Sequence, residues 1–379
     1  PYPDFMFNFI CVDINAIKGA KPQLSEYYRL LRPFGTLAIG GKKGESEALS
    51  LAHKTLVELV ASSSDIKSKF HSMKDQQWHV INRGRLPGSG EWSHQYADPG
   101  NTACSEDMRI SGDLRLQWYG KPGPYRMFDR HSYTTAPVYS SGRLFTLGER
   151  ILYANDAYNG RVLWEKELPS LEPRVNLPRD CGYMVTDRDH VYLAVKNNCI
   201  KVNARSGKTE KEFNCPKIND DYDYNWGYVA TTGGLLFGSS VRAGNFYSEG
   251  RGPWYDDSGF NNAQDSHKVL SDCLFAVDLA GNRQAWKYNG VIINSTIAIG
   301  GGLIYFVENR NRKVLQDKSR RLSGGKEWMA LHLVALDVKT GKRVWEKDMQ
   351  FEQRTPVFFS TYKDGTLVVP VSYTHLRAH

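Results

Sequence analysis

Residues 137–168 read PVYSSGRLFTLGERILYANDAYNGRVLWEKEL, and this stretch decides the fold. Turn residues divide it into the apolar runs PVYS, RLFTLG, ILYAND and RVLWEKEL. Short runs rich in Val, Ile, Leu, Tyr and Phe predict β-strands. Ser141-Gly142 and Asn159-Gly160 supply turns, because Gly and Asn accept the positive φ of tight hairpins. The stretch therefore predicts a four-stranded antiparallel meander, which needs copies of itself to bury both faces.

A motif at the end of this stretch recurs along the chain. Its full form, Asp-x-x-x-Gly-x-x-x-Trp, stands at residues 156–164 and again at residues 337–345. A copy at Asn203 has Lys211 in the Trp position, and a copy at Asp278 has its Gly one position early. The anchor residues are Asp156, Gly160, Trp164, Asn203, Gly207, Asp278, Trp286, Asp337, Gly341 and Trp345. A further unit that begins at Thr355 is expected to be incomplete.

The chemistry of this motif favours a structural role. Asp or Asn at the end of a strand can accept hydrogen bonds from the backbone of its own turn. Gly takes the left-handed conformation that closes the turn. Trp offers a large apolar face to a neighbouring sheet, and its N–H needs an acceptor. We therefore predict that these residues fasten each repeat to the next.

The repeats resemble a known family. Residues 333–349, LVALDVKTGKRVWEKDM, are similar to the repeat of quinoprotein-type β-propellers, the pyrroloquinoline quinone (PQQ)-like repeat family. The resemblance covers about residues 114–370. It implies a mainly β fold, in which residues 113–370 form a partial β-propeller of four-stranded antiparallel blades.

Residues 1–70 follow a different pattern. An apolar run from Phe5 to Ile14 predicts a buried strand, and residues 36–41 predict a second one. Between them, Leu24, Tyr27, Tyr28 and Leu31 have helical spacing, and residues 46–63 form a second amphipathic pattern. The order strand–helix–strand–helix indicates an α/β segment with a parallel sheet.

This segment resembles class I S-adenosylmethionine (SAM)-dependent methyltransferases. PYPDFMFNFI (residues 1–10) and EYYRLLRPFGTLAIGG (residues 26–41) are similar to two sequence segments in the late half of that domain. The resemblance implies a truncated Rossmann-like segment, the C-terminal part of such a domain, over residues 1–70. The Gly-rich loop that holds SAM in the family would lie upstream of Pro1. The chain departs from the family pattern at Asn8, where Asp is usual, and at Phe34, where Gly is usual.

The remaining segments are a linker and a tail. Residues 71–112 are rich in Gly, Pro, Asn and Asp and predict an extended linker. Within it, Trp92 and His94 stand out, either as anchoring side chains or as ligand contacts. The last residues, VSYTHLRAH at 371–379, resemble a translated sequencing adapter and are expected to be an artefact on an internal fragment of a longer protein.

Composition excludes several classes of protein. No apolar run in the 379 residues reaches the length of a membrane helix. The net charge is +8, but Lys and Arg alternate with Asp and Glu, so no nucleic-acid partner is expected. The six cysteines lack the spacing of a zinc site. A disulfide among Cys181, Cys199 and Cys215 stays open, with buried thiols as the simpler alternative.

Two stretches interrupt the repeats and are candidate ligand-facing loops. Residues 125–137 hold Asp129, Arg130 and His131, just before the first strand of a blade. Residues 241–268 hold Trp254, Asp256 and Asp257, whose carboxylates are suitable ligands for Ca²⁺. The oxygen spacing there is not that of a dedicated calcium loop. Each stretch has a plain alternative, namely a structural loop and a solvated insertion.

The sequence favours a non-catalytic propeller that serves as a binding or assembly platform for other proteins. A quinoprotein oxidoreductase with PQQ and calcium is one alternative, although the adjacent Cys-Cys pair of such enzymes is absent from the sequence. A SAM-dependent methyltransferase with the propeller as accessory domain is another. Resemblance to PQQ-like propellers implies a periplasmic or exported protein, whereas the methyltransferase segment implies a cytoplasmic one.

Overall fold

The structure, a computed structural model, describes most of the chain. It covers residues 2–17, 23–42, 54, 66–72, 75–120, 126, 135–171, 181–245, 268–318, 320–322, 328–349, 358–370 and 376–378. No helix within these ranges combines the length and the apolar character needed to cross a membrane.

The N-terminal sheet has the strand order β1-β2-β4-β3. Its elements are β1 (Phe7–Asp13), α1 (Leu24–Leu30), β2 (Leu31–Lys42), β3 (Ile66–Ser72) and β4 (Gln76–Arg83). β1 and β2 pair in parallel, as the strand–helix–strand pattern predicts, whereas β4 is antiparallel to both β2 and β3. Buried Leu24, Leu31 and Leu37 join α1 to the sheet. The second predicted helix, residues 46–63, lies outside the described residues apart from residue 54.

The sheet extends into the segment predicted as a linker. β4 and the end of β3 lie within residues 71–83, beyond the expected boundary at residue 70. β4 has few apolar residues, and what holds it is its long register with β2, from Thr36↔Asn82 to Lys42↔Gln76. Such a strand is defined by its neighbour rather than by its own pattern.

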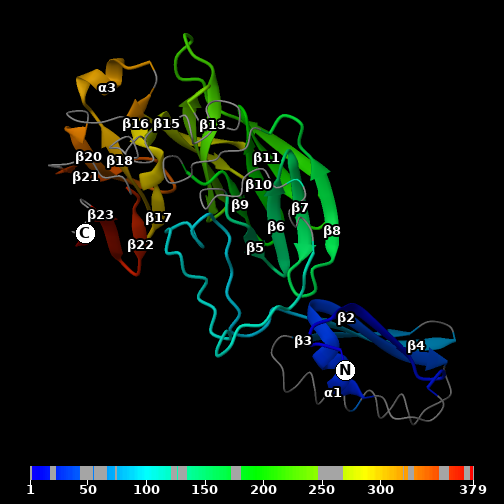
Figure 1. The fold of residues 1–379 in the computed structure, drawn as a ribbon. Helices are drawn as coiled ribbons and strands as arrows, with labels where there is room; N and C mark the ends of the chain where they lie inside the picture. Colours follow the sequence, from blue (N-terminus) through cyan, green and yellow to red (C-terminus); the bar gives the residue numbers. More distant parts are fainter. Residues whose placement is uncertain are drawn as a thin grey trace.

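The rest of the described chain forms blades of a partial β-propeller, which confirms the predicted fold class (Figure 1). Blade 1 comprises β5 (Val138–Ser140), β6 (Arg143–Gly148), β7 (Ile151–Asp156) and β8 (Val162–Glu167), as predicted for residues 137–168. Blade 2 comprises β9 (Met184–Thr186), β10 (His190–Val195), β11 (Asn198–Asn203) and β12 (Thr209–Asn214). Blade 3 comprises β13 (Tyr224–Thr232), β14 (Leu235–Arg242), β15 (Lys268–Asp278) and β16 (Arg283–Ile293).

Blade 4 comprises β17 (Ala298–Gly300), β18 (Leu303–Asn309), β20 (Leu331–Asp337) and β21 (Arg343–Met349). The start of blade 5 comprises β22 (Thr361–Lys363), β23 (Thr366–Pro370) and β24 (Leu376–Ala378), the last of which falls in the predicted artefact tail. Three short elements complete the described fold: η3 (Asn294–Thr296), α3 (Arg312–Gln316) and β19 (Arg321–Leu322), which pairs with β15.

The core lies between neighbouring blades rather than inside any one of them. One apolar cluster joins blades 1, 2 and 3, with Phe145, Tyr192 and Trp226 among its buried side chains. Further clusters join blade 3 to blade 4 and blade 4 to the start of blade 5. Figure 1 shows the blades following one another in an arc from β5–β8 to β22–β23, with the N-terminal sheet below blade 1. Each blade therefore depends on its neighbours for stability.

Candidate functional site

None of the predicted ligand-facing residues falls within the described part of the chain. Asp129, Arg130 and His131 lie outside it, and so do Trp254, Asp256 and Asp257. The candidate site is therefore built from the contacts that the blades make with each other, with residues 84–112 and with the N-terminal sheet.

The Asp or Asn of each motif copy organises its own turn. Asp337 Oδ1 accepts the backbone N–H of Lys339 and of Thr340, at 3.2 and 2.8 Å. Gly341 then donates its N–H to the Asp337 carbonyl at 2.9 Å, and its φ of +66° is left-handed. Asn203 Oδ1 accepts the corresponding two backbone N–H groups, and Asp156 Oδ1 accepts the first of them, from Tyr158, so Asn and Asp are interchangeable in this role.

In blades 1 and 3, the motif Trp packs on the turn of the next blade. Trp164 Nε1 donates to the Ala204 carbonyl at 3.1 Å, and its ring lies where a Cβ on Gly207 would come within 2.8 Å. Trp286 donates to the Val338 carbonyl at 2.9 Å and covers Gly341 in the same way. The Gly is therefore needed for space as well as for its φ.

The register inside each blade explains why Trp fits there. Ala154, Ala276 and Ala335 stand directly opposite Trp164, Trp286 and Trp345 on the neighbouring strand. On its other side, each Ala pairs with an aromatic residue of the second strand of the blade. The centroids of that ring and of the Trp ring lie 5.9, 6.1 and 6.0 Å apart in blades 1, 3 and 4. These rings are Phe145, Phe237 and Tyr305. A small residue between two rings lets them meet over it.

Blade 2 departs from the motif, and blade 3 departs with it. In blade 2, Lys201 pairs with Lys211 where the other blades have Ala and Trp. The turn of blade 3, which that Trp would cover, has Asn282 at φ +51° where the other turns have Gly. Because blade 2 has no Trp to cover this turn, there is room for a side chain at residue 282. Asn also accepts the left-handed conformation that the turn requires.

Residues 91–102, here called the inner segment, connect all five blades. One backbone N–H from the first strand of each blade donates to the inner segment. The donors and acceptors are Tyr139 to the Trp92 carbonyl (2.6 Å), Thr186 to the Ser93 carbonyl (2.9 Å), Thr231 to His94 Nε2 (3.2 Å), Ile299 to the Pro99 carbonyl (2.8 Å) and Tyr362 to the Gly100 carbonyl (2.8 Å). Each donor pairs with the residue five positions later in its own hairpin, so the five positions are equivalent.

His94 occupies the middle of the inner segment. It is 5% exposed, and burial lowers its pKa to about 3. Because Nε2 accepts from Thr231, the ring proton is assigned to Nδ1, which lies 2.7 Å from Ser93 Oγ. Both ring nitrogens are engaged, which corresponds to the anchoring role considered for His94 rather than to the ligand contact.

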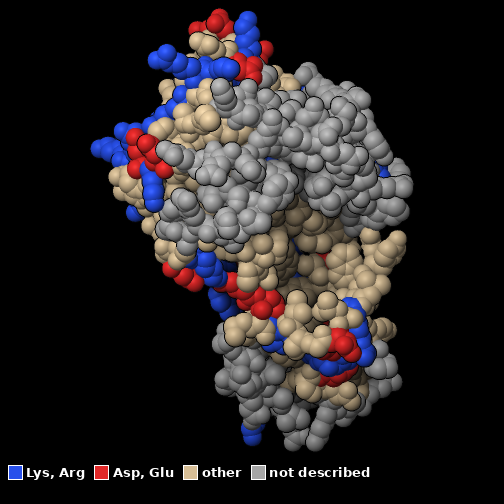
Figure 2. All heavy atoms as spheres, turned by 60° about the vertical axis from the view of Figure 1, so that its left-hand side comes forward, with Lys and Arg blue, Asp and Glu red and all other residues tan. Residues whose placement is uncertain are grey.

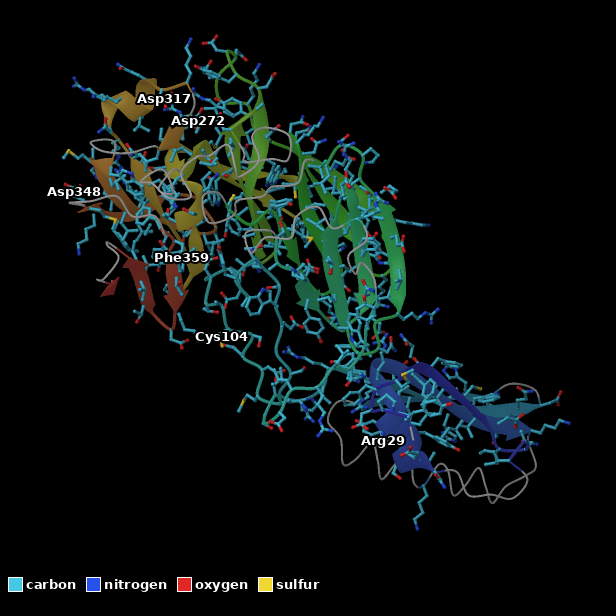
Figure 3. All side chains as sticks on the ribbon, viewed as in Figure 1. Arg29, Cys104, Asp272, Asp317, Asp348 and Phe359 are labelled. Carbon is cyan, nitrogen blue, oxygen red and sulfur yellow. The ribbon has the colours of Figure 1, made fainter. Side chains whose placement is uncertain are left out.

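Asn101 and Tyr96 attach the inner segment to the far end of the arc. Asn101 Nδ2 donates to the carbonyls of Ile297 and Ser360, at 2.8 and 3.0 Å, and so bridges blades 4 and 5. The ring of Tyr96 stacks on Phe359 at 6.0 Å between centroids. Figure 3 shows Phe359 where blade 5 faces this segment.

The N-terminal sheet contacts the motif turn of blade 1. Asp156 is fully buried there, with its Oδ2 at 2.5 Å from Arg32 Nε and at 2.7 Å from Asn8 Nδ2. Burial lowers the pKa of Arg32 from its usual value, and the neighbouring Asp156 opposes that shift. Phe34, at φ +60°, places its ring at Gly142 of the first hairpin. Asn8 and Phe34, the two departures from the methyltransferase pattern, are thus both contacts with blade 1.

A cavity of about 590 Å³ lies where the N-terminal sheet, residues 86–117 and blade 1 meet. This junction cavity is lined by Phe5, Leu86, Ser89, Gly90, Glu91, Trp92, Ser105, Asp107, Arg109, Ile110, Gln117, Tyr139, Ala157 and Tyr158. Figure 2 shows the surface hollowed between the propeller and the N-terminal sheet, with mostly uncharged residues around the hollow.

Polar groups of the junction cavity are fixed by hydrogen bonds. The hydroxyls of Tyr139 and Tyr158 lie 3.3 Å apart, and burial raises the pKa of Tyr158 far above its usual value. Asp107 accepts the backbone N–H of Gly90 at 2.9 Å, and this bond, with those from Arg109 and Ile110, lowers the pKa of Asp107. The cavity therefore combines an aromatic lining with a carboxylate held ionised near neutral pH.

Two further clusters lie away from this cavity. Buried Asp272 binds Arg242 at 2.8 Å, Arg320 at 2.6 Å and the Tyr224 hydroxyl at 2.9 Å, near the end of the blades opposite the N-terminal sheet (Figure 3). A second cavity of about 410 Å³ lies between residues 98–106 and the hairpin turns of blades 3 to 5.

The structure places no disulfide among the six cysteines, all of which lie in its described ranges, so Cys181, Cys199 and Cys215 are thiols. Cys181, Cys199 and Cys273 are buried, and burial raises the pKa of Cys215 to about 12. Sequence reasoning missed the continuous contact of residues 91–102 with the blades, because no motif in that segment signals its partners. Trp92 and His94, which the sequence analysis considers as anchoring side chains, are the residues that could have indicated this contact.

Comparison with known proteins gives fold-level likeness. No family model matches the chain, and no curated protein matches it. The structure is similar to quinohemoprotein alcohol dehydrogenase ADHIIG of Pseudomonas putida HK5, with TM-score 0.44 and 14% identity over 76% of this chain and 44% of that one. It is similar to the quinohemoprotein alcohol dehydrogenase of Comamonas testosteroni, with TM-score 0.48 and 13% identity over 74% and 46% of the two chains.

BamB from Moraxella catarrhalis is also similar, with TM-score 0.36 and 9% identity over 64% of this chain and 59% of that one. The chain thus spans about half the length of these solved structures. The assignment of a partial propeller rests on the four-stranded blades and on the Trp contacts between them.

The described residues do not fit a PQQ–calcium site or a SAM site. Within the described ranges, no group of three or more His, Cys, Asp or Glu side chains is placed to hold a metal ion. The inner segment occupies the inner edges of the blades at five equivalent positions. The described residues of β1, α1 and β2 include no Gly-rich loop between a strand and a helix, and in the methyltransferase pattern that loop would lie upstream of Pro1. No step through either cofactor follows from these residues.

Proposed function

We propose that this chain is a non-catalytic propeller that works as a binding platform, with the junction cavity as its binding site. The observation that carries the proposal is that three parts of the chain build one aromatic-lined cavity. Phe5 lies just before β1 of the N-terminal sheet, Trp92 belongs to the inner segment, and Tyr139 and Tyr158 belong to blade 1.

The dimensions and chemistry of the cavity support binding of an apolar or aromatic group. Its volume lies in the range of about 300–1,000 Å³ that is usual for ligand sites. Aromatic rings contribute a large contact area at low entropic cost, and Asp107 and Arg109 at the rim offer polar recognition. An aromatic side chain of a partner protein is the occupant that these features suit.

The position of the cavity gives the platform a rigid frame. Asp156, which holds Arg32 and Asn8, is next in sequence to Ala157, and Ala157 lines the cavity. Trp92 pairs with Tyr139 by two backbone hydrogen bonds, of 3.1 and 2.6 Å. Cavity walls that are fixed before binding reduce the entropic cost of association.

The test uses N-acetyl-tryptophanamide as probe in saturation-transfer NMR with the full chain. We expect signal transfer to its indole, and loss of that transfer in Ile110→Glu, which puts a charge at the cavity rim where Ile110 is 71% exposed. Leu315→Glu, on α3 and also exposed, is the matched control and should bind the probe like the wild type. Absence of transfer in the wild type, or equal transfer in both variants, contradicts the proposal.

The quinoprotein and methyltransferase alternatives are distinguished separately. The platform predicts no quinone absorbance and no alcohol- or sugar-dependent dye reduction when PQQ and Ca²⁺ are added. It also predicts no transfer of a labelled methyl group from SAM. An exported or periplasmic location belongs to the same proposal, and cell fractionation checks it.

A further inference from the structure

The second cavity, of about 410 Å³ and here called the blade 4 cavity, occupies on blade 4 the place that the junction cavity occupies on blade 1. Tyr139 is the middle residue of β5, and Ile299 is the middle residue of β17. Each donates its N–H to a carbonyl of the inner segment, that of Trp92 or that of Pro99 respectively. Tyr139 and Trp92 line the junction cavity. Ile299 and Pro99 line the blade 4 cavity, so the two cavities are equivalent by the repeat of the propeller.

The hairpin turns beside the two cavities are joined in the same way. On blade 1, the N–H of Ala157 donates to the Gly142 carbonyl at 3.0 Å. On blade 4, the N–H of Val338 donates to the Gly302 carbonyl, also at 3.0 Å. Gly142 and Gly302 have nearly the same φ, +78° and +79°. The motif turn and the first hairpin turn thus form one backbone frame, which is present on both blades.

On blade 1, the N-terminal sheet occupies this frame. Arg32 Nε lies 2.5 Å from Oδ2 of the motif residue Asp156. Phe34 places its ring where a Cβ on Gly142 would come within 2.7 Å. These two side chains of β2 stand two positions apart in the sequence and reach the two turns together. The frame therefore accepts a guanidinium on its carboxylate and an aromatic ring on its glycine.

On blade 4, both contact points are open. Asp337 uses Oδ1 for its own turn, and no described residue donates to its Oδ2. Hydrogen bonds from the hydroxyl and the backbone of Thr340 lower the pKa of Asp337, so the carboxylate is ionised near neutral pH. The ring of Tyr362 lies over Gly300 and Gly301. Gly302 has no described atom within 4 Å of the position of an added Cβ.

The charge around the blade 4 cavity favours a cationic occupant. Three carboxylates and two ammonium groups line it, those of Asp98, Glu106, Asp364, Lys339 and Lys363. The ion pair between Lys363 and Glu106 neutralises one of each. Asp337, next in sequence to the lining residue Val338, adds a further carboxylate. An excess of negative charge attracts a guanidinium toward this end of the cavity.

We infer that the blade 4 cavity binds a segment of a partner protein that presents an arginine and an aromatic residue two positions apart, as Arg32 and Phe34 are. The guanidinium binds Oδ2 of Asp337, and the ring covers Gly302. The volume of the cavity is within the usual range of about 300–1,000 Å³ for ligand sites. This inference goes beyond the proposed function, which uses the junction cavity, and either one can fail without the other.

Photo-cross-linking of the full chain locates the site. The probe is the acetylated and amidated peptide Leu-Arg-Pro-Phe-Gly, the sequence of residues 31–35, with benzoylphenylalanine in place of phenylalanine. Mass spectrometry of the digested product should place the label within residues 299–303 or 338–339. A label confined to blade 1, where the peptide would displace the chain's own Arg32 and Phe34, overturns the inference. So does a label spread evenly over the chain.

Three single substitutions test the contact with Asp337. Asp337→Asn keeps an oxygen for the turn, as Asn203 does in blade 2, but removes the charge. It should raise the peptide concentration for half-maximal labelling roughly twofold to fivefold, as expected for a half-exposed ion pair. Lys339→Glu, at an exposed residue of the lining, should lower that concentration by a similar factor.

Asp278→Asn is the matched control. It makes the same change in the motif turn of blade 3, and residues 278–281 of that turn, all of them described, do not line the blade 4 cavity. This variant should be labelled like the wild type. Equal labelling of Asp337→Asn and the wild type overturns the inference, and so does an equal loss in both Asn variants. The binding of N-acetyl-tryptophanamide at the junction cavity should be the same in all three variants, which separates the two sites.

Discussion

At the scale of single residues, the glycine of a motif turn that a Trp covers serves two purposes. Gly341 has φ +66°, and a Cβ added to it would lie 2.5 Å from the ring of Trp286. Gly365 has φ +84°, with nothing within 4 Å of the corresponding position. The two glycines share the backbone requirement and differ in what packs on them.

We therefore predict a larger loss of stability for Gly341→Ala than for Gly365→Ala. Each change places Ala in the left-handed region, which costs roughly 1–2 kcal/mol. Gly341→Ala also forces Trp286 away, which adds about 1–3 kcal/mol of overpacking. Urea denaturation of the two variants measures the difference. Equal losses would show that the Trp contact contributes nothing.

At the scale of elements, the inner segment carries no strand or helix pattern in the sequence, and yet it contacts all five blades. The strands of blade 1 follow from the alternation and turns of residues 137–168, because each strand carries its own pattern. Residues 91–102 carry none, since their partners are main-chain N–H groups of five separate strands. Contacts that use the main chain leave no residue-type signature, and for this reason the segment was predicted as a linker.

The candidate site was predictable only in part, for a related reason. Trp92 stands out as an isolated aromatic, but Phe5 lies near the start of the chain and Tyr139 and Tyr158 lie in residues 137–168, with no motif shared between the two stretches. Their meeting depends on how the N-terminal sheet packs on blade 1. The motif residues, by contrast, were found because repetition along the chain reveals a common requirement.

His94 makes attachment of the inner segment sensitive to acid. Its pKa is about 3 in the folded chain and near 6.5 when unfolded, because burial disfavours the charged ring. The unfolded chain therefore binds a proton first as the pH falls. Stability from the neutral ring is fully present above about pH 6.5 and is lost progressively toward pH 3, by at most about 1.4 kcal/mol per pH unit.

We predict that His94→Gln reduces the loss of stability between pH 7 and pH 4.5. Gln keeps an acceptor for the N–H of Thr231 but does not titrate. Denaturant unfolding at the two pH values gives the comparison, and His71→Gln, at an exposed histidine of β3, is the control. If His94→Gln and the wild type lose stability in parallel, His94 does not account for the acid sensitivity.

At the scale of the whole molecule, a buried carboxylate is one of the contacts that join the N-terminal sheet to the propeller. Asp156 belongs to a turn that recurs in four blades, yet this copy alone among the described turns also binds Arg32 and Asn8. The turn of blade 3 has Asp278 in the same position, where its Oδ1 accepts the N–H of Ala280 at 3.0 Å. A pair of substitutions can therefore separate the turn from the docking.

We predict that Asp156→Asn destabilises the chain by about 3–5 kcal/mol, because it leaves Arg32 buried without its counter-charge. Asp278→Asn should cost less than about 1 kcal/mol, since Asn203 already fills that role in blade 2. Hydrogen exchange of β1 and β2 should rise in Asp156→Asn and stay unchanged in Asp278→Asn. Adding Arg32→Met to Asp156→Asn removes the unpaired charge and should restore most of the loss. Equal effects of the two Asn variants would mean that the ion pair with Arg32 does not hold the N-terminal sheet on blade 1.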